Sequence, residues 1–105
     1  MSISELDFEV LCDELSLRAG ACLPEDPRGV VAFLHGIPSG GPPDPDDPGY
    51  PGLSRDFAER GWVASWMDMR AARGAPGYFS IEGWVNDAVA LINSLKEMEQ
   101  LGPLP

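Results

Sequence analysis

The chain has 105 residues, of which 17 are acidic and seven are basic, so its formal net charge at pH 7 is -10. This charge repels nucleic-acid phosphates and anionic lipid surfaces, which argues against partners of either kind. The length predicts a single domain, residues 1–105. The longest clearly apolar stretch, Val30–Leu34, is far shorter than the ~20 residues of a membrane span, and the first residues lack the basic start of a signal peptide. We therefore expect a cytoplasmic protein.

Two runs with an apolar side chain at every second position predict a β-hairpin at the start of the chain. The runs are Leu6–Cys12 and Leu15–Leu23, and Asp13 and Glu14 lie between them. If these two residues form the turn, the apolar side chains of both strands share one face. The expected pairs on that face are Cys12 with Leu15, Val10 with Leu17, and Phe8 with Ala19.

The same pairing separates the two cysteines. Cys22 pairs with Glu5 on the opposite face from Cys12, so no disulfide between the cysteines is expected. A metal site is not expected either, because zinc needs three or four clustered ligands and the chain has one histidine.

A strand, a helix and a second strand are predicted after the hairpin. Val30–Leu34 is apolar without alternation, which is typical of a central strand covered on both faces. A loop rich in Gly, Pro and Asp follows over residues 35–52, and Leu53–Arg60 then has helical spacing and ends at Gly61. Trp62–Met67 is a second apolar strand, so these segments predict a βαβ unit.

A second helix is predicted near the end of the chain. The loop Arg70–Phe79 leads to Ser80, a suitable N-cap, and Gly102 and Pro103 are the expected stop. Apolar residues at spacings of three, four and seven predict the face that packs on the sheet. They are Ile81, Trp84, Val85, Ala88, Ile92 and Leu95.

The segment after the first apolar strand carries the main functional signal. His35-Gly36-Ile37-Pro38 lies where a strand end opens into a loop, so its backbone amides can point at a ligand. Such amides suit an oxyanion hole, which stabilises the tetrahedral intermediate of acyl transfer.

With this loop, the sequence over residues 29–95 resembles the α/β-hydrolase family, in which an HGxP or HGG loop follows the third strand. Further matching segments are Gly49–Leu53, Phe57–Gly61, Asp68–Arg70, Gly74, Gly77, Phe79–Ile81, Gly83, Trp84, Asp87 and Ala88. The resemblance implies an α/β fold with two main helices, a partial sheet of strand order 1-2-4-3 and an antiparallel second strand. It also implies that Ile37 gives an oxyanion donor, that His35 and Gly36 anchor the loop, and that no cofactor is needed.

The resemblance implies hydrolysis of an ester or other acyl bond of a small molecule by a serine nucleophile. The chain departs from the family because no GxSxG segment, catalytic acid or catalytic histidine follows the second helix. Ser39 is a poor substitute, since Ile37 replaces the first glycine and no helix follows it. We expect His35 to be a loop anchor rather than a base, and Asp68 a turn acceptor rather than a catalytic acid. The chain alone is expected to be inactive, and the alternative is a non-catalytic interaction or assembly module.

Two other features have structural interpretations. The acidic loop residues Asp44, Asp46 and Asp47 suggest a calcium loop, but the position that requires glutamate is Arg55, so we expect a solvated loop. The three tryptophans, Trp62, Trp66 and Trp84, fall on the apolar faces and are expected to pack in the core.

In the family order Val30–Leu34 lies at an edge of the partial sheet. A flat apolar edge strand is a template for pairing with another chain. We therefore expect self-association, or capture of a complementing chain, through this strand.

Overall fold

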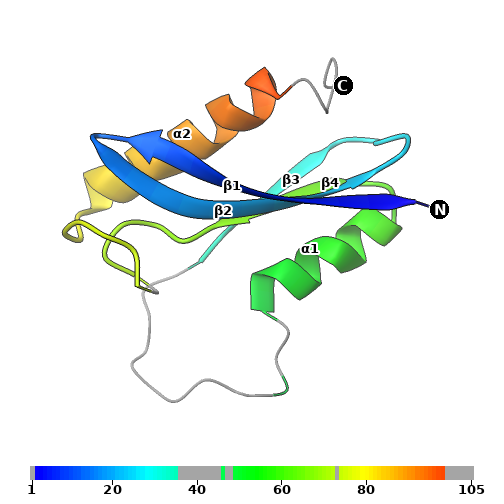
Figure 1. Cartoon of the computed structure of the whole chain (residues 1–105), viewed down its shortest axis with the longest axis horizontal. Coiled ribbons are helices and arrows are strands. Elements are labelled where there is room, and N and C mark those ends of the chain that lie inside the picture. The colour runs from blue at the N-terminus through cyan, green and yellow to red at the C-terminus, as the bar shows by residue number, and fades with distance from the viewer. Residues whose placement is uncertain (1, 36–45, 47–48, 73, 99–105) are drawn as a thin grey trace.

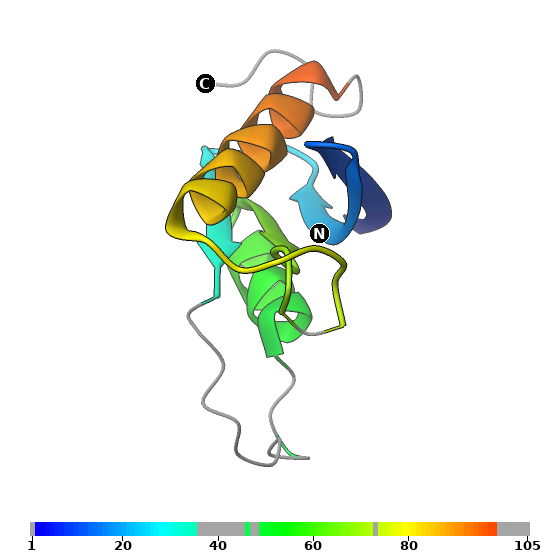
Figure 2. The same ribbon diagram turned by 90° about the vertical axis from the view of Figure 1, so that its left-hand side faces the viewer.

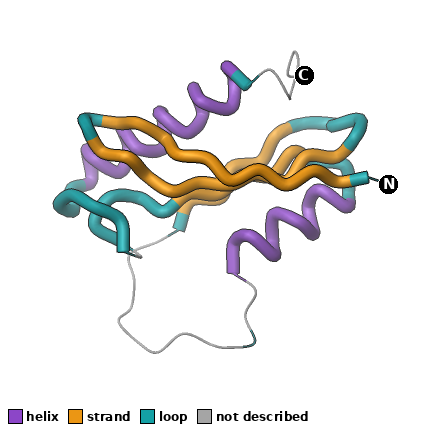
Figure 3. Tube along the Cα trace, in the orientation of Figure 1, coloured by secondary structure: helices purple, strands orange, loops and turns teal. Residues whose placement is uncertain are grey.

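The structure is a computed structural model that describes residues 2–35, 46, 49–72 and 74–98. It has three layers, with a sheet between two helices that lie on opposite faces (Figures 1 and 3). The elements in chain order are β1 (Ile3–Cys12), β2 (Leu15–Pro24), β3 (Val30–Leu34), α1 (Gly49–Glu59), β4 (Val63–Met67) and α2 (Ile81–Glu97).

The predicted hairpin is confirmed in its turn and in its register. Asp13 and Glu14 both have positive φ, 48° and 67°, as a two-residue type I′ turn requires. Cys12 pairs with Leu15 and Cys22 pairs with Glu5, so the cysteines lie on opposite faces of the sheet and both are free. The alternating pattern therefore determined the hairpin.

The sheet has four strands in the order β1-β2-β4-β3, with β2 antiparallel to β4 and β3 parallel to it. This is the expected order of a partial α/β-hydrolase sheet. The prediction of a central position for Val30–Leu34 from its apolar run was wrong, because β3 lies at the edge and is only half-buried or exposed along its length. The fully buried strand is β4, which lies between two others.

Helix α1 begins at Gly49, earlier than the predicted Leu53, and ends as predicted at a glycine. Gly61 has a φ of 94°, its amide donates to Ala58 O, and the Trp62 amide donates to Phe57 O. These two bonds are the Schellman pattern, which needs the left-handed conformation that glycine adopts without strain.

Helix α2 begins at the predicted cap, where the Ser80 hydroxyl accepts from the Gly83 amide at 2.9 Å. It ends at Glu97, so the expected stop at Gly102 and Pro103 lies outside the described residues. The predicted packing face was wrong in part. Ile81, Val85 and Ile92 are exposed, and the buried positions are Gly83, Asp87, Leu91 and Leu95. The helix has two apolar sides, and the side of Leu91 and Leu95 is the one that meets the sheet.

The main core lies between the sheet and α2. Its buried members are Val10, Leu17, Ala19, Ala21, Leu23, Val63, Met67, Met69, Leu91 and Leu95. On the opposite face Trp66 packs directly over Gly20, where an added Cβ would stand 2.8 Å from the ring. No described helix is long and apolar enough to cross a bilayer.

Candidate functional site

The candidate site lies at the carboxyl ends of the parallel strands β3 and β4. His35 follows β3, and Asp68, Met69 and Arg70 follow β4, while Trp84 reaches this end from the first turn of α2. We refer to these five residues as the strand-end cluster. Because parallel strands end at one edge of a sheet, residues that are far apart in the sequence meet here.

His35 connects the two strand ends. His35 is 7% exposed, and its Nε2 accepts a hydrogen bond from the Met69 amide at 3.0 Å. The His35 ring also meets the Trp84 ring edge-on, with centroids 5.2 Å apart at 88°. An Nε2 atom that accepts from a backbone amide carries a lone pair, so this geometry uses His35 to position the loop after β4.

Trp84 extends the cluster with a second aromatic contact. Its Nε1 donates to the Arg70 carbonyl at 2.9 Å, and its ring meets Phe79 at 4.9 Å and 85°. The indole therefore satisfies its donor while packing both rings at the edge-to-face angle that aromatic pairs prefer.

Arg70 holds the cluster to α2 and to the hairpin turn. Its guanidinium donates to both oxygens of Asp87 at 2.8 to 3.2 Å and to Asp13 at 2.9 Å, and its backbone amide donates to Asp87 at 2.9 Å. Asp87 is 0% exposed, so its carboxylate depends on these donors. We call Arg70, Asp87 and Asp13 the arginine clasp.

Two groups at the clasp have pKa values that differ from their ordinary values. Hydrogen bonds from Arg70 and then Asn86 lower the pKa of Asp13 below its ordinary value of 3.8. Burial, followed by the charges of Asp13 and Asp87, raises the pKa of the Cys12 thiol. Cys12 lies 3.5 Å from the Arg70 guanidinium, and its raised pKa keeps it a thiol rather than a nucleophilic thiolate.

Asp68 is the other buried carboxylate of the site. It is 7% exposed, and Arg18 lies 3.9 Å from it with a mostly exposed side chain. The Asp68 amide donates to Arg18 O at 2.9 Å, while the Arg18 guanidinium stacks over Trp66. Asp68 is thus held at the strand end beside a cation that reaches solvent.

Several residues that the sequence analysis singled out are not part of the strand-end cluster. Gly36, Ile37 and Ser39 lie outside the described residues, as do Asp44 and Asp47, and Asp46 is exposed. Among the residues that are described, no group of three or more His, Cys, Asp or Glu side chains is arranged to hold a metal ion.

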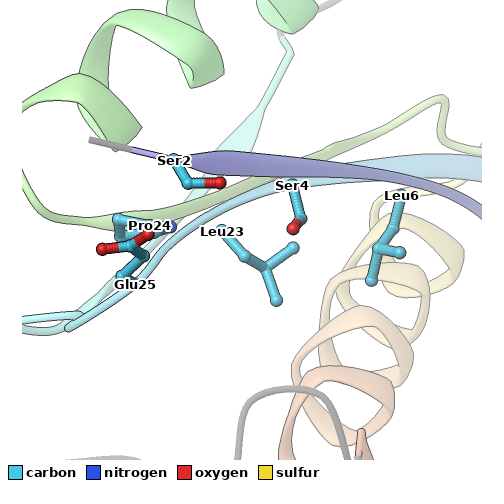
Figure 4. Close-up of a pocket in the computed structure, with 6 residues that line it drawn as sticks. All are labelled: Ser2, Ser4, Leu6, Leu23, Pro24 and Glu25. Carbon is cyan, nitrogen blue, oxygen red and sulfur yellow. The ribbon is translucent and has the colours of Figure 1, made fainter.

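A pocket of about 240 Å³ lies elsewhere, at the open end of the β1–β2 hairpin (Figure 4). Pro24 pairs with Ile3 there, while His35 lies beyond the other end of the parallel strands. The lining residues are Ser2, Ser4, Leu6, Leu23, Pro24 and Glu25. It contains no residue of the strand-end cluster.

The sequence reasoning missed the arginine clasp. Asp87 and Arg70 appeared only as residues that match the family, Arg70 also as the start of a loop, and they were not connected with each other. One signal was present, because Asp87 lies four residues before Leu91 and eight before Leu95, on the buried side of the helix. A carboxylate at a core position needs a cation, and Arg70 in the preceding loop was available.

Comparison with known proteins identifies the type of fold. No protein-family model matches the sequence, and no curated protein matches it. Among solved structures the chain is similar to an α/β-hydrolase, and the fold is a partial α/β-hydrolase-like sheet with two helices.

That structure is epoxide hydrolase VrEH1 from Vigna radiata. The similarity has a TM-score of 0.59 and 25% sequence identity, and it covers 87% of this chain. The chain spans only 28% of the length of the epoxide hydrolase.

Proposed function

We propose that the parent activity of this chain is hydrolysis of an ester or other acyl bond by a serine nucleophile. The observation that supports this proposal most is the similarity to a hydrolase over 87% of the chain. The similar protein is an epoxide hydrolase, so epoxides are the second substrate class to test. Two free thiols are in keeping with a reducing compartment, and we propose that the protein acts in the cytoplasm.

In this proposal the chain supplies one half of an oxyanion hole. The Ile37 amide donates to the developing oxyanion of a small acyl substrate, while Gly36 and His35 hold its loop in place. One such donor contributes about 3 kcal/mol to transition-state stabilisation. The second donor, the nucleophile, the acid and the base come from outside this chain, which alone is inactive.

The first experiment assays the purified chain with 4-nitrophenyl acetate and with styrene oxide. We expect no turnover above the buffer rate for either substrate. Turnover of the ester that disappears in Ser39→Ala would overturn the proposal, because Ser39 would then be a nucleophile within this chain.

The second experiment tests the oxyanion role. This chain replaces the matching segment of VrEH1, and circular dichroism checks that the chimera folds. We expect epoxide hydrolysis by the chimera, a fall in kcat of about 10²-fold or more in Ile37→Pro, which lacks the amide donor, and no change in Ser39→Ala. A folded chimera in which Ile37→Pro has no effect contradicts the assignment.

The alternative is a non-catalytic interaction module that uses the same half-fold. The open edge of β3 favours it, since β4 is its one neighbour among the described strands. A neighbouring reading frame that encodes a strand with GxSxG favours the divided enzyme. A stable, specific complex without any such partner favours the module.

A further inference from the structure

One edge of the sheet has backbone groups available for pairing. The Val63 amide donates to Gly29 O at 2.9 Å, which fixes the phase of the parallel ladder between β3 and β4. Because alternate residues of a strand bond to opposite sides, the amides of Val30, Ala32 and Leu34 point away from β4. No strand covers that side in the described part of the chain.

The side chain of Leu34 extends this edge toward α2. Phe33 packs with Tyr50 and Phe57 on the α1 side of the sheet, with centroids 6.2 and 5.1 Å apart. Successive side chains of a strand point to opposite faces, so Leu34 lies on the α2 side, where it is 44% exposed.

Two contacts determine which flank of α2 lies toward β3. Asn86 Nδ2 donates to Asp13 at 3.4 Å, so the flank of α2 that carries Asn86 lies toward the hairpin turn. Trp84 meets His35 at the end of β3, so the other flank lies toward the open edge. Figure 2 shows the first turns of α2 beside β3, whereas the closest approach of α2 to the sheet is over β1.

The flank of α2 toward β3 is apolar and exposed. Ile81 lies three residues before Trp84, and Val85 and Ile92 continue the same side at helical spacing. Val85 is 56% exposed. Val89 lies next to this flank on the outer side of α2, and Leu34 lies at the end of β3. We call the five exposed residues Leu34, Ile81, Val85, Val89 and Ile92 the apolar flank. An exposed apolar surface beside an unpaired strand edge is typical of an interaction site.

The charge of the chain selects the kind of partner. A second copy would carry the same net charge of -10 over its whole chain, so the two copies would repel at low ionic strength. A basic chain is attracted by the same field. We propose that the open edge of β3 and the apolar flank bind a separate basic polypeptide, which adds an apolar strand to the sheet. This inference does not depend on the hydrolytic role.

The test uses a labelled peptide of five valines with three lysines at each end. Fluorescence anisotropy measures its binding to the full chain at 50 and 300 mM NaCl, and sedimentation measures the state of the chain alone. We expect binding that weakens at least tenfold at the higher salt concentration, and a monomeric chain without peptide. A peptide with glutamates in place of the lysines should bind at least tenfold more weakly.

Variants test the two parts of the surface. Leu34→Pro removes an outward amide and a side chain, whereas Leu34→Ala removes the side chain alone. We expect Leu34→Pro to bind about fivefold more weakly than Leu34→Ala, the loss of one net hydrogen bond. Val85→Gln with Val89→Gln should weaken binding about tenfold, and Asn93→Gln on the hairpin flank should not change it. Circular dichroism verifies the fold of each variant.

Each contrary outcome overturns the proposal. A dissociation constant weaker than about 1 mM for the folded chain excludes the surface as a strand-binding site. Equal binding of the glutamate peptide excludes the charge preference. A dimer of the chain alone that Leu34→Pro dissociates makes a second copy the occupant instead.

Discussion

At the scale of single residues, Arg70 joins three segments that are distant in the sequence. Its partners Asp13 and Asp87 belong to the hairpin turn and to α2, and Arg70 itself follows β4. The guanidinium side chain is 11% exposed and Asp87 is fully buried. Removal of one partner from such a pair costs more than removal of both, because it leaves a buried charge without compensation.

Arg70→Met should therefore destabilise the chain by about 3–5 kcal/mol. In the double variant Arg70→Met with Asp87→Asn, the amide oxygen still accepts from the backbone amide of residue 70 and no buried charge remains. We expect the double variant to recover a large part of the loss in urea unfolding. A double variant as unstable as the single one contradicts this account of Asp87.

The stability that Asp13 contributes should depend on pH. Its pKa is lowered in the folded chain, so the contribution is complete above the ordinary value of 3.8 and is lost as the pH falls through the lower folded value. We expect Asp13→Asn to unfold at lower urea than the parent at pH 6, with the difference disappearing in acid. A difference that is independent of pH would show that Asp13 acts without its charge.

Ala71 has a strained backbone conformation. Its φ is 62°, in the left-handed region, and its amide donates to Pro76 O. A Cβ in this region costs about 1–2 kcal/mol, and glycine loses about 0.5–1 kcal/mol more backbone entropy on folding. Ala71→Gly should raise the free energy of unfolding by about 0.5 kcal/mol, measured by urea unfolding with Ala75→Gly as the control. An unchanged or lower stability excludes strain at Ala71.

At the scale of elements, α1 contains a buried hydroxyl that has no partner among the described residues. Ser54 is 0% exposed, and its Oγ makes no hydrogen bond there. A buried polar group without a partner costs about 1–3 kcal/mol, and alanine is the better helix former. Ser54→Ala should increase the stability of the chain by about 1 kcal/mol in thermal or urea unfolding. A destabilised variant would indicate a partner for the hydroxyl.

The elements differ in how much of them the sequence predicts. The hairpin is local, and the period-two pattern with a two-residue loop leaves one register that keeps the apolar side chains on one face. The local sequence does not determine which side of α2 packs on the sheet. Val85 and Leu91 are equally apolar, and the choice depends on Asp87 and its distant partner Arg70. The edge position of β3 likewise depends on which strands lie beside it and not on its own residues.

The candidate site, too, was predictable from the sequence only in part. Its place at the strand ends follows from His35 directly after an apolar strand and Asp68 directly after the next one. The contact of His35 with the Met69 amide and with Trp84 requires the parallel pairing of β3 and β4, which no single segment encodes. The oxyanion assignment of Ile37 stays a prediction.

At the scale of the whole molecule, the net charge of -10 opposes compaction. Screening by salt weakens this self-repulsion, since the Debye length falls from about 30 Å at 0.01 M to about 10 Å at 0.1 M. We expect the Tm to rise between 0.01 and 0.1 M NaCl, as measured by calorimetry. A falling Tm would mean that ion pairs such as the arginine clasp outweigh the general repulsion.

The opposite placement of the two cysteines makes one of them a natural reporter of a helical layer. Cys12 lies beneath Arg70 on the α2 side, and Cys22 pairs with Glu5, which binds Arg55 of α1 on the other side. Burial raises the pKa of both thiols, so in the folded chain each is slow to react. A maleimide reagent should therefore modify the buried Cys22 at the rate at which α1 detaches, whereas the half-buried Cys12 should react without the loss of α2.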